Sequence, residues 1–418
     1  MPHKKSASTL RDIDDIVAEA EGLALAIDLE IVKTRVAKVA RINPGLLIGK
    51  GTVEEIGEEI KELKPDVVII NHTLSPVQQQ NLEKSWKVKV IDRTGLILEI
   101  FGARAQTKEG VIQVRLAALE YQRSRVVRSW THLERQRGGT GKAGGPGEKQ
   151  MELDKRHITD KILKLKKDLE DVRRTRELGR KSRERVPYPV VALVGYTNAG
   201  KSTLFNRITN AKVFAEDLLF ATLDPTMRRI KLKNAQNVIL SDTVGFISEL
   251  PTHLIAAFRA TLEQVLHADV IIHVIDVARP DHEAQRQDVI KILIDLGIEY
   301  ETDERIIEAW NKADLLSAEE KGEFQRHQNF SARGVLISAQ KGTGQDDLLA
   351  KVASILSRSR QILTFEIPHT DGKAVSWLHE HAEILERRDD DEMSVLKVSI
   401  EPHNIGKFLE RFTYQPVP

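Results

Sequence analysis

The first hundred residues alternate short apolar runs with amphipathic stretches. "DVVII" at 66–70 and "VKVID" at 88–92 predict two buried parallel strands. "TVEEIGEEIKEL" at 52–63 has apolar residues at helical spacing, which predicts a helix with Thr52 as its N-cap. The pattern predicts a small α/β domain over residues 1–105.

From residue 112 the spacing of apolar positions changes to alternating steps of four and three, and the same spacing returns after residue 158. Two helices with matching apolar seams and a short connection predict an antiparallel hairpin, which we assign to residues 106–186. With roughly 25 residues per arm, the hairpin would be about 40 Å long. The seam positions are Ile112, Leu116, Leu119, Val126, Trp130 and Leu133, then Ile158, Ile162, Leu165, Leu169 and Val172.

Charge sets the hairpin apart from the rest of the chain. The whole chain has 63 Lys and Arg against 62 Asp and Glu, a net charge of +1. Residues 121–186 hold 20 basic and 10 acidic residues, so they carry +10 and the remainder carries −9. The hairpin therefore fits an anionic partner better than any other part of the chain does.

The tip of the hairpin is rich in glycine, with six glycines among the ten positions from Gly138 to Gly147. It does not fit a phosphate loop, because a helix precedes it and no Gly-Lys-Ser/Thr opens the helix that follows. A disordered connector is one interpretation. The other is a backbone probe that enters a crowded crevice while basic side chains contact phosphates, with RNA and acidic protein both open as partners. The basic residues near the tip are Arg135, Arg137, Lys142, Lys149, Lys155 and Arg156.

Two stretches contain a lysine among glycines, but only one has the context of a phosphate loop. "GLLIGKGT" at 45–52 has Lys50 where the second glycine should be, so we expect a strand-to-helix turn there. "VPYPVVALVGYTNAGKSTLFNRIT" places G-x-x-x-x-G-K-S at 195–202, between an apolar strand and a helix. Its backbone amides would surround the β-phosphate, Lys201 would add charge to the β- and γ-phosphates, and Ser202 would bind Mg²⁺.

The motifs that follow have the order that a GTPase needs. "VILSDTVG" ends in D-x-x-G, where Asp242 would hold the Mg²⁺ shell through water and the amide of Gly245 would sense the γ-phosphate. In "NKAD" at 311–314, Asp314 offers two carboxylate oxygens to N1–H and the amine of guanine, which adenine cannot match. Leaving that carboxylate unpaired would cost ATP a factor on the order of 10⁴. In "VLISAQ", Ser338 and its neighbour Ala339 would contact the O6 atom of the base.

Two positions in the switch regions bear on catalysis. Thr222 and Thr226 in "LLFATLDPT" both offer a hydroxyl to Mg²⁺, and either could instead be a plain loop residue. Phe246 follows D-x-x-G, where Ras-type GTPases carry the glutamine that orients water, and a phenyl ring cannot orient water. We expect slow hydrolysis that awaits a partner or a cation, and we assign no side chain as the catalytic base. Phe246 could also simply pack beneath the switch.

The remaining features define the class of protein. There is no cysteine, which excludes disulfides and favours a reducing compartment, and no apolar run approaches the length of a membrane span. No secretory signal is visible at the N-terminus, so we expect a cytoplasmic protein without membrane insertion, and a monomer. Residues 361–418 predict a small α/β module with strands at "QILTFEIP" and "SVLKVSIE", helices at "GKAVSWLHEHAEIL" and "IGKFLERF", a turn at "DDDE" and no metal site at its paired histidines.

These motifs together resemble the HflX family of translation-factor-class GTPases. The resemblance covers nearly the whole chain and rests on "ERQRGGTGKAGGPGE" at 134–148, "GYTNAGKST" at 195–203, "FATLDPT" at 220–226, "DTVGF" at 242–246 and "NKAD" at 311–314. The tip departs from the usual "GGIGTRGPGET" by a glycine pair, lysines and an apparent insertion of one residue, which puts the reach of the tip in question. The resemblance implies an α/β fold with four parts: the N-terminal domain at 1–105, the hairpin at 106–186, a P-loop GTPase domain at 187–360 and a C-terminal domain at 361–418.

The resemblance also implies a function. It implies a Mg²⁺-dependent GTPase that is slow alone, is stimulated by ribosomes, binds the rRNA of the large ribosomal subunit and splits stalled or idle ribosomes, notably in heat stress. It favours Thr222 over Thr226 as the metal-contacting threonine. Alternatives that the residues leave open are an assembly GTPase on large-subunit precursors, a protein-regulating GTP switch without RNA, and a binder without turnover.

The site assignments fall into three sets. The residues assigned to GTP are Gly195, Tyr196, Thr197, Asn198, Ala199, Gly200, Lys201, Ser202, Thr203, Phe220, Ala221, Thr222, Leu223, Asp224, Asp242, Thr243, Val244, Gly245, Asn311, Lys312, Asp314, Ser338, Ala339 and Gln340. The metal is assigned to Ser202, Thr222 and Asp242. The residues assigned to rRNA are Arg135, Arg137, Gly138, Gly139, Lys142, Gly144, Gly145 and Lys149.

Overall fold

The structure is a computed structural model of the 418-residue chain. It describes residues 11–39, 41–136, 146–181, 188–211, 219–220, 226–233, 236–248, 265–326, 333–358, 361–390, 392–400 and 402–417. These residues fall into two compact units, which we treat separately. The first lies within Met1–Lys231 and Asn237–Gln345, and the second within Leu232–Gln236 and Asp346–Pro418.

The N-terminal part of the first unit, residues 11–104, is a small α/β layer. Its two strands pair in parallel, with Val67 opposite Lys89, as predicted. The side chains of Leu82, Trp86 and Val90 are buried in its core. Its elements are α1 (Ile13–Leu25), α2 (Lys50–Leu63), β1 (Val67–Ile70), α3 (Pro76–Trp86), β2 (Lys89–Asp92) and α4 (Arg93–Arg104).

The start of α2 differs from the prediction. Gly49 is the N-cap and makes no side-chain capping bond, so the assignment of Thr52 as N-cap is wrong and Thr52 lies in the first turn. The reason is that the backbone already turns helical at Lys50, directly after the extended Gly49. A turn precedes the helix as expected, but no strand leads into it among residues 31–39 and 41–49, where Asn43 and Leu47 form only an isolated bridge. The Asn43 side chain accepts a hydrogen bond from the backbone N–H of Gly45 at 2.8 Å.

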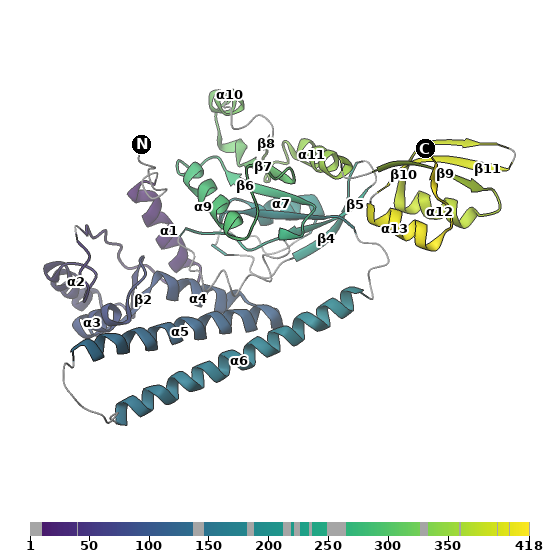
Figure 1. Ribbon diagram of the computed structural model, residues 1–418. Coiled ribbons are helices and arrows are strands. Elements are labelled where there is room, and N and C mark those ends of the chain that lie inside the picture. The colour runs from purple at the N-terminus through teal and green to yellow at the C-terminus, as the bar shows by residue number, and fades with distance from the viewer. Residues whose placement is uncertain are drawn as a thin grey trace, which may run out of the picture. The chain divides into compact units, whose positions relative to one another are not determined.

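Two long helices, α5 (Lys108–Gln136) and α6 (Pro146–Lys181), form the predicted hairpin and pack against each other (Figure 1). The predicted seam is buried at Ile112, Leu116, Ile162 and Leu169. The side chains of Val126, Trp130 and Leu133 lie outside the described residues.

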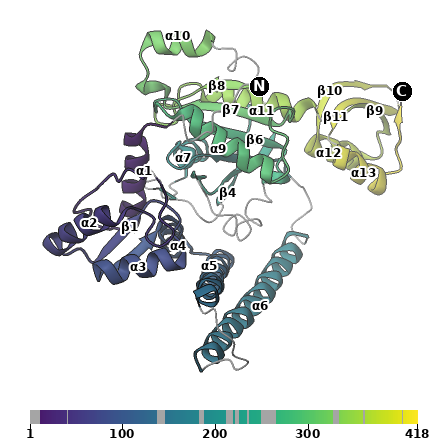
Figure 2. The same ribbon diagram turned by 60° about the vertical axis from the view of Figure 1, so that its left-hand side comes forward.

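The rest of the first unit is built on a six-stranded sheet in the order β4-β5-β3-β6-β7-β8, in which all neighbours are parallel except β4 and β5. Helix α7 packs on β3, β4 and β5, and α9 packs on β6 (Figure 2). The carboxyl ends of β3, β5 and β7 meet at one edge, where ligands bind in sheets of this kind. The elements are β3 (Val190–Gly195), α7 (Lys201–Thr209), β4 (Thr226–Lys231), β5 (Asn237–Asp242), β6 (Val270–Asp276), α9 (His282–Asp295), β7 (Ile306–Asn311), η2 (Ala313–Leu315), α10 (Ala318–Arg326) and β8 (Gly334–Leu336).

The second unit contains a four-stranded antiparallel sheet in the order β10-β11-β9-β12, with α12 and α13. The predicted helix at 372–385 is too long, because α12 ends at His381 and the next residues pair with β11, Ala382 opposite Ile400. The ladder to a distant strand overrides the helical spacing of "AEIL". The elements are α11 (Gln345–Arg358), β9 (Gln361–Pro368), α12 (Gly372–His381), β10 (Ala382–Asp389), β11 (Met393–Ile400), α13 (Pro402–Arg411) and β12 (Pro416–Val417).

The described residues contain neither a helix that could cross a membrane nor a cluster of metal-ligating side chains. No helix among them is long and apolar enough to cross a membrane. Within the same residues, no group of three or more His, Cys, Asp or Glu side chains is placed to hold a metal ion. His381 instead stacks on Trp377, with ring centroids 4.1 Å apart.

Candidate nucleotide-binding site

The phosphate loop runs from the end of β3 to the start of α7, as predicted. Gly200 has a φ of +93°, and a Cβ there would lie 2.2 Å from Nδ2 of Asn311. Asn198 also has a positive φ, of 60°. Residue 200 must therefore be glycine, both for its backbone conformation and for the close approach of Asn311.

Lys201 is the buried cation of this loop, with a residue exposure of 6%. Its Nζ donates to the carbonyl oxygen of Tyr196 at 2.7 Å. Burial lowers the pKa of Lys201 to about 8, and the negative charge of Asp242 opposes that shift only in part. A phosphate group would supply the counter-charge that this ammonium group lacks in its buried position.

The first and second motifs meet at the carboxyl end of β5. Asp242 is the last residue of that strand and is fully buried. The hydroxyl of Ser202 donates to its Oδ2 at 2.7 Å. Residues that lie 40 positions apart in the sequence are thus brought together, as the prediction of a shared Mg²⁺ site requires.

The start of switch II, which we define as residues 245–248, lies directly against the phosphate loop. The backbone N–H of Thr197 donates to the carbonyl of Phe246 at 2.7 Å, and the N–H of Phe246 donates to the carbonyl of Gly195 at 3.0 Å. A Cβ on Gly245 would lie 2.9 Å from Cγ2 of Thr197, so this approach also requires glycine. Phe246 is 2% exposed and belongs to the main core, in agreement with its predicted packing beneath the switch.

The base-recognition loops are joined by side-chain hydrogen bonds. Oδ1 of Asn311 accepts from the backbone N–H of Ala339, and its Nδ2 donates to the carbonyl of Ala199, both at 2.8 Å. The hydroxyl of Ser338 donates to Oδ1 of Asp314 at 2.7 Å, and this bond lowers the pKa of Asp314. Asp314 is therefore ionised at neutral pH, as an acceptor for the guanine N1–H must be.

Two side chains that support these loops were missed by the sequence reasoning. Arg207 on α7 donates to the carbonyls of Gln340 at 3.0 Å and of Lys341 at 2.9 Å. Asp276, at the end of β6, lies 2.7 Å from the Nζ of Lys312. Neither residue is part of a short motif, so no local signal in the sequence could have identified it.

The switch I assignments are only partly visible. Phe220 is described, with a φ of 58° and an edge-to-face contact to Phe101 at 4.7 Å. Thr226 opens β4 opposite Asp242 in the register. The assigned residues that lie outside the described part of the chain are Ala221, Thr222, Leu223 and Asp224.

The residues assigned to rRNA also lie mostly outside that part. Residues 137–145 are not described, and of Arg135 and Lys149 only the backbone is, in α5 and α6. The role of the glycine-rich tip therefore stays a prediction.

The sequence is similar to known GTPases, in agreement with the nucleotide-binding site described above. Residues 14–102, 104–183 and 190–312 match families described as GTP-binding GTPase N-terminal, GTP-binding GTPase Middle Region and 50S ribosome-binding GTPase. The chain is 46% identical to a GTPase HflX of Magnetococcus marinus, with 94% of this chain and 89% of that one covered. It is 42% identical to the GTPase HflX of Escherichia coli, over 87% and 84% of the two chains.

Among solved structures, a GTP-binding protein from Sulfolobus solfataricus in complex with GDP is similar, with 23% identity, a TM-score of 0.44 and coverage of 82% of this chain and 96% of that one. The sequence similarity to HflX proteins extends over nearly the whole chain and includes all three matched regions. The chain belongs to the HflX family of GTPases.

Proposed function

We propose that this protein is a cytoplasmic GTPase that binds the large ribosomal subunit and splits stalled or idle ribosomes, notably in heat stress. The observation that carries the nucleotide part is the set of bonds that joins Ser202 to Asp242 and Asn311 to Ala199 and Ala339. The ribosomal part is supported by the match of residues 190–312 to a family described as 50S ribosome-binding GTPase and by the basic hairpin.

Mg²⁺ fits the donors at this site. Ser202 and Asp242 supply oxygen atoms only, which Mg²⁺ prefers, and Asp242 is buried. Ser202 would hold the ion directly and Asp242 through water, with Thr222 as the third protein group. When bound, the ion offsets the charge that develops on the β- and γ-phosphates.

The protein's own residues bind and orient GTP, but they leave hydrolysis slow. The backbone amides of the phosphate loop and Lys201 hold the phosphates, while Asp314 and Ala339 select guanine. Phe246 is packed into the core, so its side chain cannot orient the attacking water. A group from the ribosome, or a cation held there, would complete the site.

The hairpin would act as the ribosome-binding arm. We assign residues 1–105, 106–186, 187–360 and 361–418 to four functional parts, with rRNA contacts at the tip between Arg135 and Lys149. Tight binding of the GTP form, followed by hydrolysis and release, is sufficient to drive splitting.

The test is steady-state GTP hydrolysis with and without purified large ribosomal subunits, using Lys201→Ala as the blank. We expect a rise of about a hundredfold, or roughly 2.7 kcal/mol in the barrier. No stimulation would mean that another partner controls the GTPase. Stimulation by precursor particles alone would favour an assembly role.

A second experiment addresses the hairpin. Deletion of Gly138–Gly147 should leave GTP affinity unchanged and abolish the splitting of ribosomes in a sedimentation assay. A matched variant that keeps the loop length but replaces Arg135, Arg137, Lys142 and Lys149 with glutamine should weaken binding and flatten its salt dependence. Unchanged splitting by the deletion would exclude the tip from the mechanism.

A further inference from the structure

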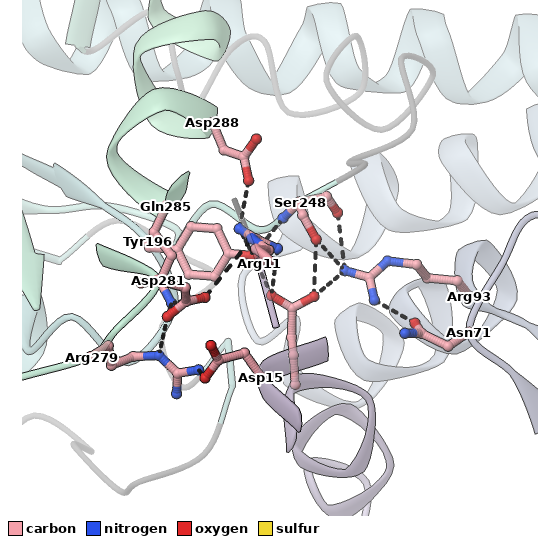
Figure 3. Close-up of polar contacts among 11 residues, drawn as sticks. Arg11, Asp15, Asn71, Arg93, Tyr196, Ser248, Arg279, Asp281, Gln285 and Asp288 are labelled. Atoms are coloured by element: carbon pink, nitrogen blue, oxygen red, sulfur yellow. Dashed lines mark hydrogen bonds and ion pairs between the residues drawn. The ribbon is translucent and has the colours of Figure 1, made fainter. Parts of the chain in front are cut away.

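The start of switch II is held by side chains from outside its own loop. The backbone N–H of Ser248 donates to the hydroxyl of Tyr196 at 2.8 Å, and its carbonyl accepts from Nη2 of Arg93 at 3.0 Å (Figure 3). Its own hydroxyl donates to Oε1 of Glu19 at 2.9 Å. All three polar groups of Ser248 are thus bonded, two of them to the N-terminal part of the chain.

These contacts are buried and charged. Arg93 and Tyr196 are each 4% exposed, and Nη2 of Arg93 lies 2.6 Å from Oε1 of Glu19. Burial, together with the negative charge of Glu19, raises the pKa of Tyr196, so its hydroxyl keeps its proton and donates a hydrogen bond to Glu19. Arg93 and Glu19 form an ion pair, and each also hydrogen-bonds to Ser248, so the three residues form one buried network.

The residue before Arg93 faces the hairpin. Asp92 is 1% exposed, and its Oδ1 accepts from the hydroxyl of Tyr121 at 2.6 Å. Its Oδ2 lies 3.3 Å from Nη1 of Arg125. Tyr121 and Arg125 lie one turn apart on α5, the first helix of the hairpin.

We propose that Asp92 and Arg93 connect the start of switch II to the base of α5, so that the GTP- and GDP-bound conformations of switch II set the position of the hairpin. Arg93, Tyr196 and Glu19 are positioning residues, since they act through Ser248. The inference uses the nucleotide binding of the proposed function, but it does not depend on its ribosomal partner.

Asp92 and Arg93 are neighbours in the chain, and this is the physical basis of the connection between switch II and α5. Asp92 ends β2 and is also the N-cap of α4, where its Oδ1 accepts from the backbone N–H of Gly95 at 2.8 Å. A movement of Ser248 would displace Arg93 at the first turn of α4, because the two are hydrogen-bonded. Asp92 would move with Arg93 and displace Tyr121, which donates a hydrogen bond to it. Packed elements of this kind change between discrete arrangements rather than deform gradually.

Hydrogen exchange of the full chain, measured with GDP and with a non-hydrolysable GTP analogue, tests the connection without ribosomes. In the wild type, we expect the change of nucleotide to alter exchange both at residues 245–248 and in α5 at residues 108–125. In Tyr196→Phe, which removes one hydroxyl and keeps the packed ring, the change in α5 should fall to less than half. Arg93→Lys should have the same effect and keep its charge beside Glu19.

A matched control uses an ion pair that shares no residue with these contacts. Glu59 on α2 lies 3.2 Å from Nζ of Lys33, so Glu59→Gln should transmit the nucleotide change as the wild type does. Because coupling is reciprocal, Tyr121→Phe should change the ratio of GDP to analogue affinity by about threefold or more.

Three results would overturn the proposal. The first is α5 exchange that is the same with both nucleotides in the wild type. The second is a Tyr196→Phe variant that behaves like Glu59→Gln. The third is an unchanged affinity ratio in Tyr121→Phe. If the wild type shows the expected exchange pattern but does not split ribosomes, that result would count against the proposed function alone.

Discussion

The side-chain amide of Asn311 donates a hydrogen bond to the carbonyl oxygen of Ala199 at 2.8 Å. Ala199 belongs to the phosphate loop, and Asn311 ends β7 at the start of the base-recognition motif. The same side chain accepts from the N–H of Ala339, so one residue fixes three loops. The phosphate and base halves of the nucleotide site are therefore built as one structure.

The Asn311→Asp variant should lose that connection. The carboxylate can still accept from Ala339, but it cannot donate to Ala199 and would place a negative charge against a carbonyl oxygen. Loss of this hydrogen bond should cost about 1–3 kcal/mol of binding free energy, so the dissociation constants of GDP and GTP should both rise by roughly 10- to 100-fold. Titration with a fluorescent GDP measures this, and the exposed Asn210→Asp is the control that should bind as the wild type does. Unchanged affinity would mean that the bridge is dispensable.

The Asp314→Asn variant should change the preferred base from guanine to xanthine rather than abolish nucleotide binding. An amide presents an N–H where the carboxylate presented an oxygen, which suits the C2 carbonyl of xanthine and opposes the amine of guanine. GTP affinity should fall by on the order of 10²- to 10³-fold while XTP affinity rises. Competition between the two nucleotides measures the change. Asp276→Asn, which weakens the support of Lys312, should reduce both affinities equally.

How far the sequence predicts this protein depends on the distance over which its signals act. The phosphate loop and the D-x-x-G and N-K-A-D motifs were predictable because each needs fixed residue types within a few positions, at a strand end. The hairpin was predictable because its apolar seam repeats along the helices, as the burial of Ile162 and Leu169 confirms.

The features that the sequence predicted wrongly or did not reveal depend on contacts between residues far apart in the chain. The α12 boundary depends on pairing between Ala382 and Ile400, and nothing local to "AEIL" reveals that partner. Likewise, Glu19 reaches Ser248 across 229 positions of sequence. Such contacts are set by how the elements pack, so only the structure could identify them.

Arg207 should contribute to guanine recognition, although it lies on the helix after the phosphate loop. Arg207→Met removes both bonds to the carbonyls of Gln340 and Lys341 and should loosen the loop that presents Ala339. Because Arg207 is exposed, we expect only a roughly three- to tenfold loss of GTP affinity, with less loss for nucleotides that lack the O6 acceptor. Arg228→Met, on an exposed position of β4, is the control. Equal losses for all nucleotides would contradict a role at the base.

Lys201 should make stability depend on pH in alkaline solution. Its pKa is about 8 in the folded chain, below the ordinary value of 10.5, so the folded state disfavours the charged form. Below pH 8 both states carry the proton, and this cost is fully present. Between about pH 8 and 10.5 the unfolded state binds more protons than the folded state, so stability rises with pH. Lys201→Met removes the effect, and the wild type should gain about 2 kcal/mol of unfolding free energy relative to it between pH 7 and 10.

Urea unfolding of the wild type and Lys201→Met without added nucleotide measures the difference, in which the contributions of the other titrating groups cancel. Because a bound phosphate group restores the charge of Lys201, saturating GDP should abolish this gain. A difference that does not vary with pH would show that Lys201 keeps its ordinary pKa.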